Sequence, residues 1–183
     1  MKILTCFIAP TQGQASVAGL DIFKDPLGVR RKVGYLPENL RIPRHLNALS
    51  ALDYYGGLSG LSREQVRTKQ GELLELVGLS DRARDPVRKY SKGMVQRLGL
   101  AQALLHDPDL LFLDEPFEGI DAVASRLIRN LMQTFVKGGG TIFLTSHILE
   151  IVENLSDTLG VIHRGKLVAQ GTMDSLQAGN GGD

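Results

Sequence analysis

The sequence has no tryptophan, one cysteine and almost no net charge, and each of these excludes a class of protein. A single cysteine, Cys6, cannot form a disulfide within the chain, so a reducing compartment fits. Its apolar neighbours predict a small buried thiol. With 21 Lys and Arg against 20 Asp and Glu, the overall charge attracts neither nucleic acid nor an anionic membrane surface. An aromatic content of 5% argues against base stacking on single strands.

Long apolar runs are also missing. No run approaches the roughly 20 residues that span a bilayer. The N-terminus lacks the basic, apolar and small-residue order of a secretion signal. We therefore expect a cytosolic protein. What the 183 residues do contain is 43% hydrophobic content, which is enough for one domain with a sizeable core.

The order of apolar segments and turn residues predicts an α/β fold. Two continuous apolar runs, residues 110–113 and 141–145, are typical of parallel strands buried on both faces. The glycine-rich tail over residues 179–182 is expected to fray. The remaining expectations are a short helix end over residues 1–8, strands at 14–17, 32–36, 158–163 and 167–170, and helices at 62–77, 91–105, 125–136 and 148–155.

Two adjacent acids, Asp114 and Glu115, follow the apolar run at 110–113. In open α/β sheets, ligands bind at the carboxyl ends of the strands. Phosphoryl transfer needs a carboxylate that holds Mg²⁺ and a second group that orients the attacking water. Asp114 would hold the metal and Glu115 would act as general base. An acidic turn that merely ends a strand is the alternative, and the pair alone does not decide between them.

A second segment, Ser91-Lys92-Gly93, stands where a helix is expected to begin. The start of a helix offers backbone N–H groups and a partial positive charge, which suit a phosphate. Ser91 adds a hydroxyl group and Lys92 a cation, and Gly93 allows close approach. Taken alone, the segment is more typical of an ordinary N-cap with a basic first turn.

His147 directly follows the expected strand at 141–145, so its imidazole would lie near the same ligand and could hydrogen-bond a terminal phosphate. Most isolated histidines are simply solvated or satisfied where they lie. We interpret His45, His106 and His163 in that way.

Taken in order along the whole chain, these segments resemble the nucleotide-binding domain of ATP-binding cassette (ABC) proteins. Residues 90–97, Tyr-Ser-Lys-Gly-Met-Val-Gln-Arg, resemble the family signature Leu-Ser-Gly-Gly-Gln-x-Gln-Arg. Ser91, Gly93, Gln96 and Arg97 match it, and Tyr90, Lys92 and Met94 depart from it. The Ser-Lys-Gly form is similar to that of exporter-type cassettes. Leu110–Asp114 with Glu115 resembles Walker B and its catalytic glutamate, and residues 118–121 resemble the D-loop. His147 matches the switch histidine. The resemblance implies catalytic roles for Glu115 and His147, and ATP contacts from Ser91, Lys92, Gly93, Met94 and Asp121.

Residues 33–39, Val-Gly-Tyr-Leu-Pro-Glu-Asn, resemble the Q-loop, with Glu38 in place of the family's glutamine. A carboxylate can approach Mg²⁺ or a bound water, so the resemblance implies a metal role for Glu38 beside Asp114. In this family the Q-loop faces the membrane subunit. Residues from about 40 to 106, including the signature helix, would form a helical subdomain within a single nucleotide-binding domain over residues 1–183, and this subdomain would meet the permease.

One family motif is not in the sequence. The loop Gly-x-x-x-x-Gly-Lys-[Ser/Thr], which cradles the phosphates, is absent. By the resemblance, residues 1–4 fall on the helix after that loop, so we expect an N-terminally truncated P-loop NTPase-like fold without its first strands. Loss of this cradle would abolish useful turnover. An exposed strand edge would make folding marginal or promote aggregation.

The leading hypothesis is therefore the ATP-hydrolysing subunit of an ABC exporter, cytoplasmic and held at the membrane by its permease. Two cassettes would form a dimer around ATP and Mg²⁺, with the acids of one copy facing the Ser91 helix of the other. An alternative is a cassette fragment without catalysis that only docks or dimerises. A third hypothesis, a soluble cassette acting on chromosomes or ribosomes, is disfavoured by the short chain and the near-neutral charge.

Overall fold

The computed structural model describes residues 1–179, so the glycine-rich tail expected to fray lies outside the described residues beyond Gly179. The chain divides into two compact units, Met1–Thr145 and a second unit that begins at Ser146. The expectation of a single domain over residues 1–183 stays a prediction.

The first residues form turns, so the helix end expected over residues 1–8 is wrong. Phe7 N–H donates to the carbonyl of Lys2 at 2.8 Å, and Cys6 has a positive φ of 55°. A left-handed residue cannot continue a right-handed helix. The Cys6 thiol is half-buried rather than fully buried, and it lies 3.6 Å from the carbonyl oxygen of Ile22. Burial raises the pKa of this thiol, and the nearby charge of Arg30 opposes that shift.

A small hairpin follows in the region of the strand expected over residues 14–17. β1 (Ser16–Val17) pairs antiparallel with β2 (Leu20–Asp21). The two residues between the strands, Ala18 and Gly19, both have positive φ, which suits a tight two-residue hairpin turn. α1 (Pro26–Lys32), which we did not expect, then leads into β3 (Val33–Leu36). Asp25 caps α1 by accepting from Gly28 N–H at 2.8 Å.

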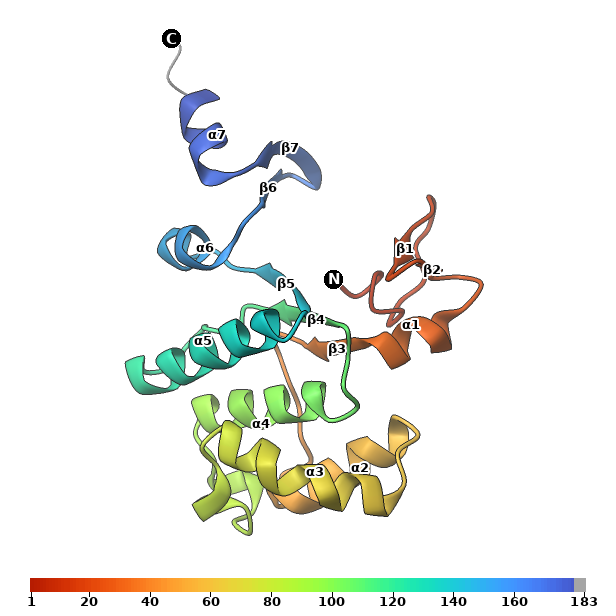
Figure 1. Cartoon of the computed structure of the whole chain (residues 1–183), viewed down its shortest axis with the longest axis vertical. Helices are drawn as coiled ribbons and strands as arrows, with labels where there is room; N and C mark the ends of the chain where they lie inside the picture. The colour runs from red at the N-terminus through yellow and green to blue at the C-terminus, as the bar shows by residue number, and fades with distance from the viewer. Residues whose placement is uncertain (180–183) are drawn as a thin grey trace. The chain divides into compact units, whose positions relative to one another are not determined.

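The first unit contains a parallel sheet of three strands in the order β3-β4-β5 (Figure 1). β4 (Leu110–Asp114) is the central strand and its middle residues are buried, as predicted. β5 (Thr141–Thr145) is parallel to β4, but it is largely accessible, and Phe143 is 47% exposed. The prediction of a strand buried on both faces is therefore wrong for β5. Within the described part of the chain its apolar residues lie at the edge of the sheet, beside β4 alone.

α4 (Lys92–Leu104) packs against the sheet. α2 (Ala48–Leu58) and α3 (Arg63–Leu76) form a pair that packs on the other side of α4, so α4 lies between this pair and the strands (Figure 1). α3 and α4 confirm two predicted helices, and Ser62 caps α3 with a full capping box to Gln65. Two short 3₁₀ turns, η1 (Ser80–Arg82) and η2 (Val87–Lys89), occupy the charged segment before α4.

α5 (Ala122–Lys137) returns the chain from β4 to β5 and begins earlier than expected, at a cap provided by Asp121. The second unit contains α6 (Leu149–Leu155), the antiparallel pair β6 (Leu159–His163) and β7 (Lys166–Gly171), and α7 (Met173–Gly179). The strands predicted at 158–163 and 167–170 are confirmed, and α7 was not expected. Among the helices described over residues 1–179, none could span a membrane.

Candidate functional site

The carboxylate of Asp114 lies at the carboxyl end of β4, where the parallel sheet brings it beside Thr145 of β5. The Thr145 hydroxyl donates to Asp114 Oδ1 at 2.6 Å. A hydrogen bond to an ionised acceptor is short and strong, so it fixes the orientation of the carboxylate. Sequence reasoning missed Thr145. The sequence contained a signal for it, because Thr145 ends the predicted strand at 141–145, and the last residues of neighbouring parallel strands lie side by side.

Glu115 is held in an uncommon backbone conformation, with φ of 51°. For a non-glycine residue this costs on the order of 1–3 kcal/mol and persists only where the surroundings impose it. Two backbone bonds do so here. Glu115 N–H donates to the carbonyl of Thr145 at 3.2 Å, and its own carbonyl accepts from Glu118 N–H at 3.1 Å. The chain therefore turns sharply after Asp114, at the predicted catalytic pair.

The side chain of Gln96 connects α4 to this turn. Gln96 is 3% exposed, and its Nε2 donates to the carbonyl of Glu115 at 3.5 Å. A buried amide group needs hydrogen-bond partners, and the backbone of Glu115 supplies one. The helix that begins at Ser91 is thus joined directly to the residue after Asp114.

The predicted N-cap at Ser91 is confirmed: its hydroxyl accepts from Met94 N–H at 3.2 Å. The first bond within the helix runs from Val95 N–H to the carbonyl of Ser91. The N–H groups of Lys92 and Gly93 precede that bond, as at every helix start. A Cβ on Gly93 would lie 3.5 Å from Ile120 and 3.6 Å from Ala124, which is ordinary contact. Packing alone therefore does not require glycine at this position.

The loop 118–121 packs against the start of α4. Lys92 Nζ lies 3.3 Å from Glu118 Oε1, so its charge is directed to that carboxylate. Asp121, for which we expected an ATP contact, caps α5 by accepting from Ala124 N–H at 2.8 Å. Gly119 between them has a positive φ of 65°. One connected structure thus runs from Asp114 through Glu115 and this loop to the first turn of α4.

Glu38 and Asp114 line one cavity of about 680 Å³ in the first unit. Tyr35 lies at the same cavity, with its hydroxyl buried and unpartnered among the described residues. Burial raises the pKa of the Tyr35 phenol, and the negative charges of Asp114 and Glu38 raise it further. The two residues expected to hold a metal ion thus line the same cavity.

This pair of acids fits Mg²⁺, which proteins usually bind through one or two carboxylates, with water and substrate phosphates completing the coordination. Asp114 is oriented by Thr145, and the neighbouring Tyr35 hydroxyl can hydrogen-bond a water molecule. Within residues 1–179 no three Asp, Glu, His or Cys side chains gather into a metal site of their own. Two carboxylates leave most of the positions around Mg²⁺ to water and a bound ligand.

His147 belongs to the second unit, where it is exposed just before α6. The neighbouring Ser146 hydroxyl accepts from Ile148 N–H at 3.1 Å, which fixes the turn around it. Asp114, Glu115 and Ser91 belong to the first unit. The predicted role of His147 beside them stays a prediction.

Arg97, which matches the last residue of the signature, binds the end of α3. Its Nη1 donates to the carbonyls of Val77 at 2.8 Å and Gly78 at 2.9 Å, at the C-terminal end of α3. A cation is favourable there because the helix end carries partial negative charge. Arg97 therefore fixes α4 against α3, and so helps to place the helix start at Ser91.

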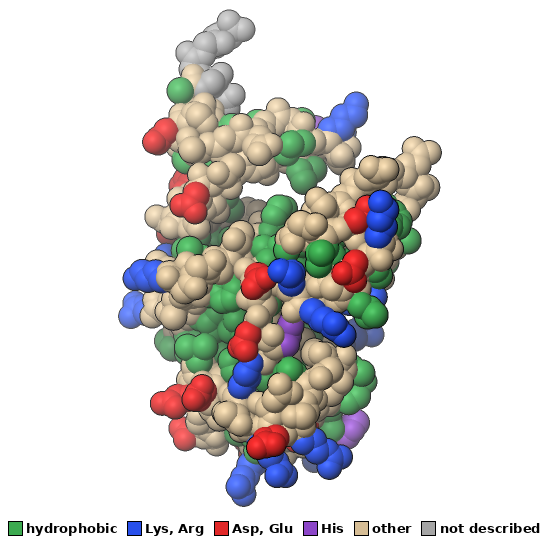
Figure 2. All heavy atoms as spheres, turned by 45° about the vertical axis from the view of Figure 1, so that its right-hand side comes forward, with side chains coloured by type: hydrophobic (Ala, Val, Ile, Leu, Met, Phe, Trp, Pro, Cys, Tyr) green, Lys and Arg blue, Asp and Glu red, His purple; other side chains and the backbone are tan. Residues whose placement is uncertain are grey.

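A second cavity, of about 700 Å³, forms a groove that runs from residues 40–44 to the start of α4. Its two walls are joined by backbone bonds from Val87 N–H to Leu46 at 2.7 Å and from Arg88 N–H to Arg44 at 3.0 Å. We call it the basic groove, because its charged lining residues are all cationic. Lys and Arg side chains are numerous at the helical end of this unit in Figure 2. The groove is lined by Leu40, Arg41, Ile42, Pro43, Arg44, Val87, Arg88, Tyr90, Lys92 and Val95.

Among known proteins, the family model described as ABC transporter matches residues 1–118. The daunorubicin resistance ATP-binding protein DrrA3 of Streptomyces coeruleorubidus is 35% identical over 183 residues, which are 100% of this chain and 58% of that protein. The ABC transporter ATP-binding protein NatA of Bacillus subtilis is 33% identical over 96% of this chain and 72% of its own length. The bacitracin transport ATP-binding protein BcrA of Bacillus licheniformis is 37% identical over 98% of this chain and 58% of its own.

Solved structures agree with the described fold. A structure of an ATP-binding subunit of an ABC transporter matches with a TM-score of 0.86 and 29% identity, over 97% of this chain and 74% of that one. A dimeric ATP-binding cassette in a post-hydrolysis state, bound to ADP and Pi, matches with a TM-score of 0.84 and 20% identity, which supports the fold alone. The chain spans 58% of the length of DrrA3 and of BcrA. On the family match and the NatA comparison, it belongs to the ABC transporter family, among proteins named for ATP binding.

Proposed function

We propose that this chain is part of an ATP-hydrolysing subunit that drives export by an ABC transporter. The observation that carries the proposal is the turn after β4, where Asp114 is oriented by Thr145 and Glu115 is held at positive φ. Strained residues of this kind cluster at active sites. Relatives named for daunorubicin resistance and bacitracin transport support export.

The described acids divide the chemistry between them. Asp114 and Glu38 would hold Mg²⁺, which supplies positive charge to the phosphate oxygens when it is bound. Glu115 follows Asp114 directly, and as general base it would orient the attacking water and take its proton. The role we predict for His147, a hydrogen bond to the terminal phosphate, belongs to the same proposal.

The start of α4 would meet the phosphates of a nucleotide held by a second copy of the protein. Ser91 caps the helix, and the N–H groups of Lys92 and Gly93 lie at its positive end. Met94 N–H is already bonded to Ser91, so its contribution is to hold the cap in place. We propose a homodimer on this basis, with Asp121 in the loop that would lie near the partner copy.

The basic groove supports docking on a membrane-spanning permease. Its apolar floor and cationic rim favour a short segment that carries both apolar and acidic side chains. The backbone bonds between its walls form it in advance, which lowers the entropic cost of binding. The protein would then be peripheral to the cytoplasmic face of the membrane.

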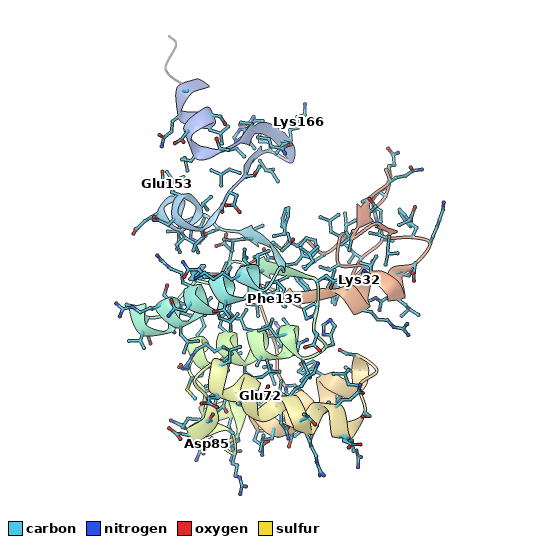
Figure 3. All side chains as sticks on the ribbon, viewed as in Figure 1. Lys32, Glu72, Asp85, Phe135, Glu153 and Lys166 are labelled. Atoms are coloured by element: carbon cyan, nitrogen blue, oxygen red, sulfur yellow. The ribbon has the colours of Figure 1, made fainter. Side chains whose placement is uncertain are left out.

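Replacing Glu115 with Gln in the complete gene product tests the catalytic role. The amide keeps the shape of the side chain but cannot accept the proton, so kcat for phosphate release should fall by about 100-fold or more. Binding of a fluorescent ATP analogue should remain. The matched control is Glu72→Gln on α3, an exposed acid labelled in Figure 3, which should change neither. Unchanged hydrolysis in Glu115→Gln would remove Glu115 from its role.

Charge reversal in the groove tests the partner. Arg44→Glu and Arg88→Glu should lower recovery of the protein with its permease-containing membranes, and added salt should have the same effect in the unmodified protein. Arg84→Glu is the control, because Arg84 is exposed on the same segment but does not line the groove. Equal recovery of all three variants would contradict docking at this groove.

The alternative function, a module that docks or dimerises without catalysis, predicts a different pattern. Groove variants would lose membrane recovery, while Glu115→Gln would have no hydrolysis to remove. Binding of the labelled ATP analogue to residues 1–183, which lack the Gly-x-x-x-x-Gly-Lys-[Ser/Thr] loop, separates the two further. Micromolar affinity there favours the ATPase.

A further inference from the structure

Lys92 stands at a position where a cation is unfavourable. It is the first residue of α4, directly after the Ser91 cap, and the start of a helix carries partial positive charge. The family resemblance offers glycine at the same position of the signature. The lysine therefore needs a compensating interaction within this chain.

The structure supplies that interaction in the loop 118–121. Lys92 Nζ lies 3.3 Å from Glu118 Oε1, and both side chains are about half exposed. The aliphatic part of the lysine lies across Gly119. A Cβ at Gly119 would come within 2.9 Å of Lys92 Nζ and 3.1 Å of its Cδ. Glycine at 119 thus allows the positive φ of 65° and also leaves room for the side chain of Lys92.

The loop reached by Lys92 is the one that holds Glu115 in place. Glu118 N–H donates to the carbonyl of Glu115 at 3.1 Å, so one residue links the ion pair to the turn after β4. Further along, Ile120 lies over Gly93 and Asp121 caps α5. The start of α4 and the loop therefore share contacts through both backbone and side chains.

We propose that Lys92 is a positioning residue for hydrolysis: its ion pair with Glu118 holds the loop 118–121 on the start of α4 and thereby fixes the turn at Glu115. This assignment rests on the proposed ATPase function. It differs from the expectation that Lys92 contacts ATP directly, because the lysine acts through Glu118.

A charge swap in the complete gene product distinguishes the two roles. Lys92→Glu and Glu118→Lys should each lower kcat about three- to tenfold with little change in KM for ATP, and the double variant should recover to within about twofold of the unmodified protein. A lysine that binds phosphate would give another result. Lys92→Glu would raise KM, and the double variant would not recover, which would overturn the proposal.

The pair Lys32–Asp109 is the matched control. It is an exposed ion pair at 3.2 Å near the opposite end of β4, and Lys32 is labelled in Figure 3 at the end of α1. The same swap at Lys32 and Asp109 should leave kcat and KM unchanged. A similar loss of kcat there would mean that the Lys92 effect is general electrostatics, and the positioning role would be rejected.

Amide hydrogen exchange provides a readout that does not depend on hydrolysis. In Lys92→Gln, amides of residues 118–121 should exchange about threefold faster, because the loop loses an exposed ion pair. Amides of β4 should be unaffected. Unchanged exchange at 118–121 overturns the proposal even if no hydrolysis is found, whereas faster exchange without hydrolysis would retain the ion-pair link and reject the proposed function.

Discussion

The side-chain amide of Gln96 reaches the backbone carbonyl of Glu115 across 3.5 Å and joins α4 to the turn after β4. The amide is almost fully buried, while the same carbonyl also accepts from Glu118 N–H at 3.1 Å. The longer of the two bonds comes from the helix that carries Ser91. The bond therefore links the position of α4 to the backbone of Glu115.

Replacing Gln96 with Met tests this link. Methionine has a similar volume but no donor, so the free energy of unfolding should fall by about 0.5–1.5 kcal/mol, towards the lower value because the bond is long. Urea denaturation measures the change. Gln133→Met on the exposed side of α5 is the control and should stay close to zero. If Gln96→Met unfolds at the same urea concentration as the unmodified protein, the bond contributes nothing.

Thr145→Val removes the hydroxyl group that Asp114 accepts from at 2.6 Å and keeps the shape of the side chain. Hydrogen bonds to charged groups are worth more than neutral ones, and this site is half-buried, so a loss of about 1–2 kcal/mol of stability is expected. Thr141→Val, at the exposed start of the same strand, should be neutral or slightly stabilising. Equal effects at the two positions would show that strand propensity alone explains the change.

The elements that the sequence predicted well are those with strong local signals. α3 and α4 begin at serine caps, and the apolar run ending in Asp114 forms the central strand. β5 has the same apolar character but lies at the edge of the sheet. The burial of a strand depends on whether it has neighbouring strands on both sides, and the composition of the strand itself does not reveal this.

The candidate site, too, was predicted mainly where its residues are close together in the sequence. Asp114 and Glu115 are adjacent in sequence, so their partnership was visible, whereas Thr145 and Gln96 reach them through pairing of strands and packing of a helix. Lys92 was expected to face a phosphate because a helix start attracts anions. Its carboxylate partner, Glu118, became evident only when the fold placed the loop on the helix.

The positive φ at Glu115 predicts an unusual order of stability among its variants. Glycine adopts this conformation without penalty, and alanine does not, so Glu115→Gly should be more stable than Glu115→Ala by about 1 kcal/mol. In a helix or strand the order would be reversed. Thermal or urea denaturation of the two variants measures the difference. A more stable Glu115→Ala would show that the turn relaxes once the glutamate is gone.

His106 predicts a loss of stability on mild acidification. Burial lowers the pKa of His106 below the ordinary value of 6.5, and the positive charge of Lys69 lowers it further. Hydrogen bonds to the backbone of Val33 and Arg30 and the negative charge of Asp107 raise the pKa, but burial is the largest effect. Between the folded pKa and 6.5 the unfolded chain binds more protons, so stability falls as the pH falls.

The slope due to His106 can reach about 1.4 kcal/mol per pH unit. His106→Gln keeps a donor for the Val33 carbonyl but cannot be charged, so this part of the slope should disappear. Urea denaturation at several pH values from 7.5 downward measures it. The exposed His45 provides the control His45→Gln, which should retain the slope. An unchanged slope in His106→Gln would assign the acid sensitivity to other groups.

The edge position of β5 predicts self-association. Its strand residues Ile142, Phe143 and Leu144 pair with β4 on one side, and in the described residues the sheet ends there. An apolar edge strand exposes N–H and C=O groups that can pair with another copy. Phe143 is 47% exposed, and its ring lies 5.3 Å from that of Phe112. Sedimentation velocity should therefore show association that grows with protein concentration.

Phe143→Lys should reduce this association, because a charge on an edge strand opposes pairing with a second copy. Val136→Lys is a matched control: Val136 is 48% exposed, but it lies on α5, a helix, and so cannot pair as an edge strand. If general hydrophobic contact causes association, both lysines will reduce it equally. If the edge of β5 causes the association, only Phe143→Lys will reduce it. The reduction will also persist in high salt, which screens repulsion between distant surface charges.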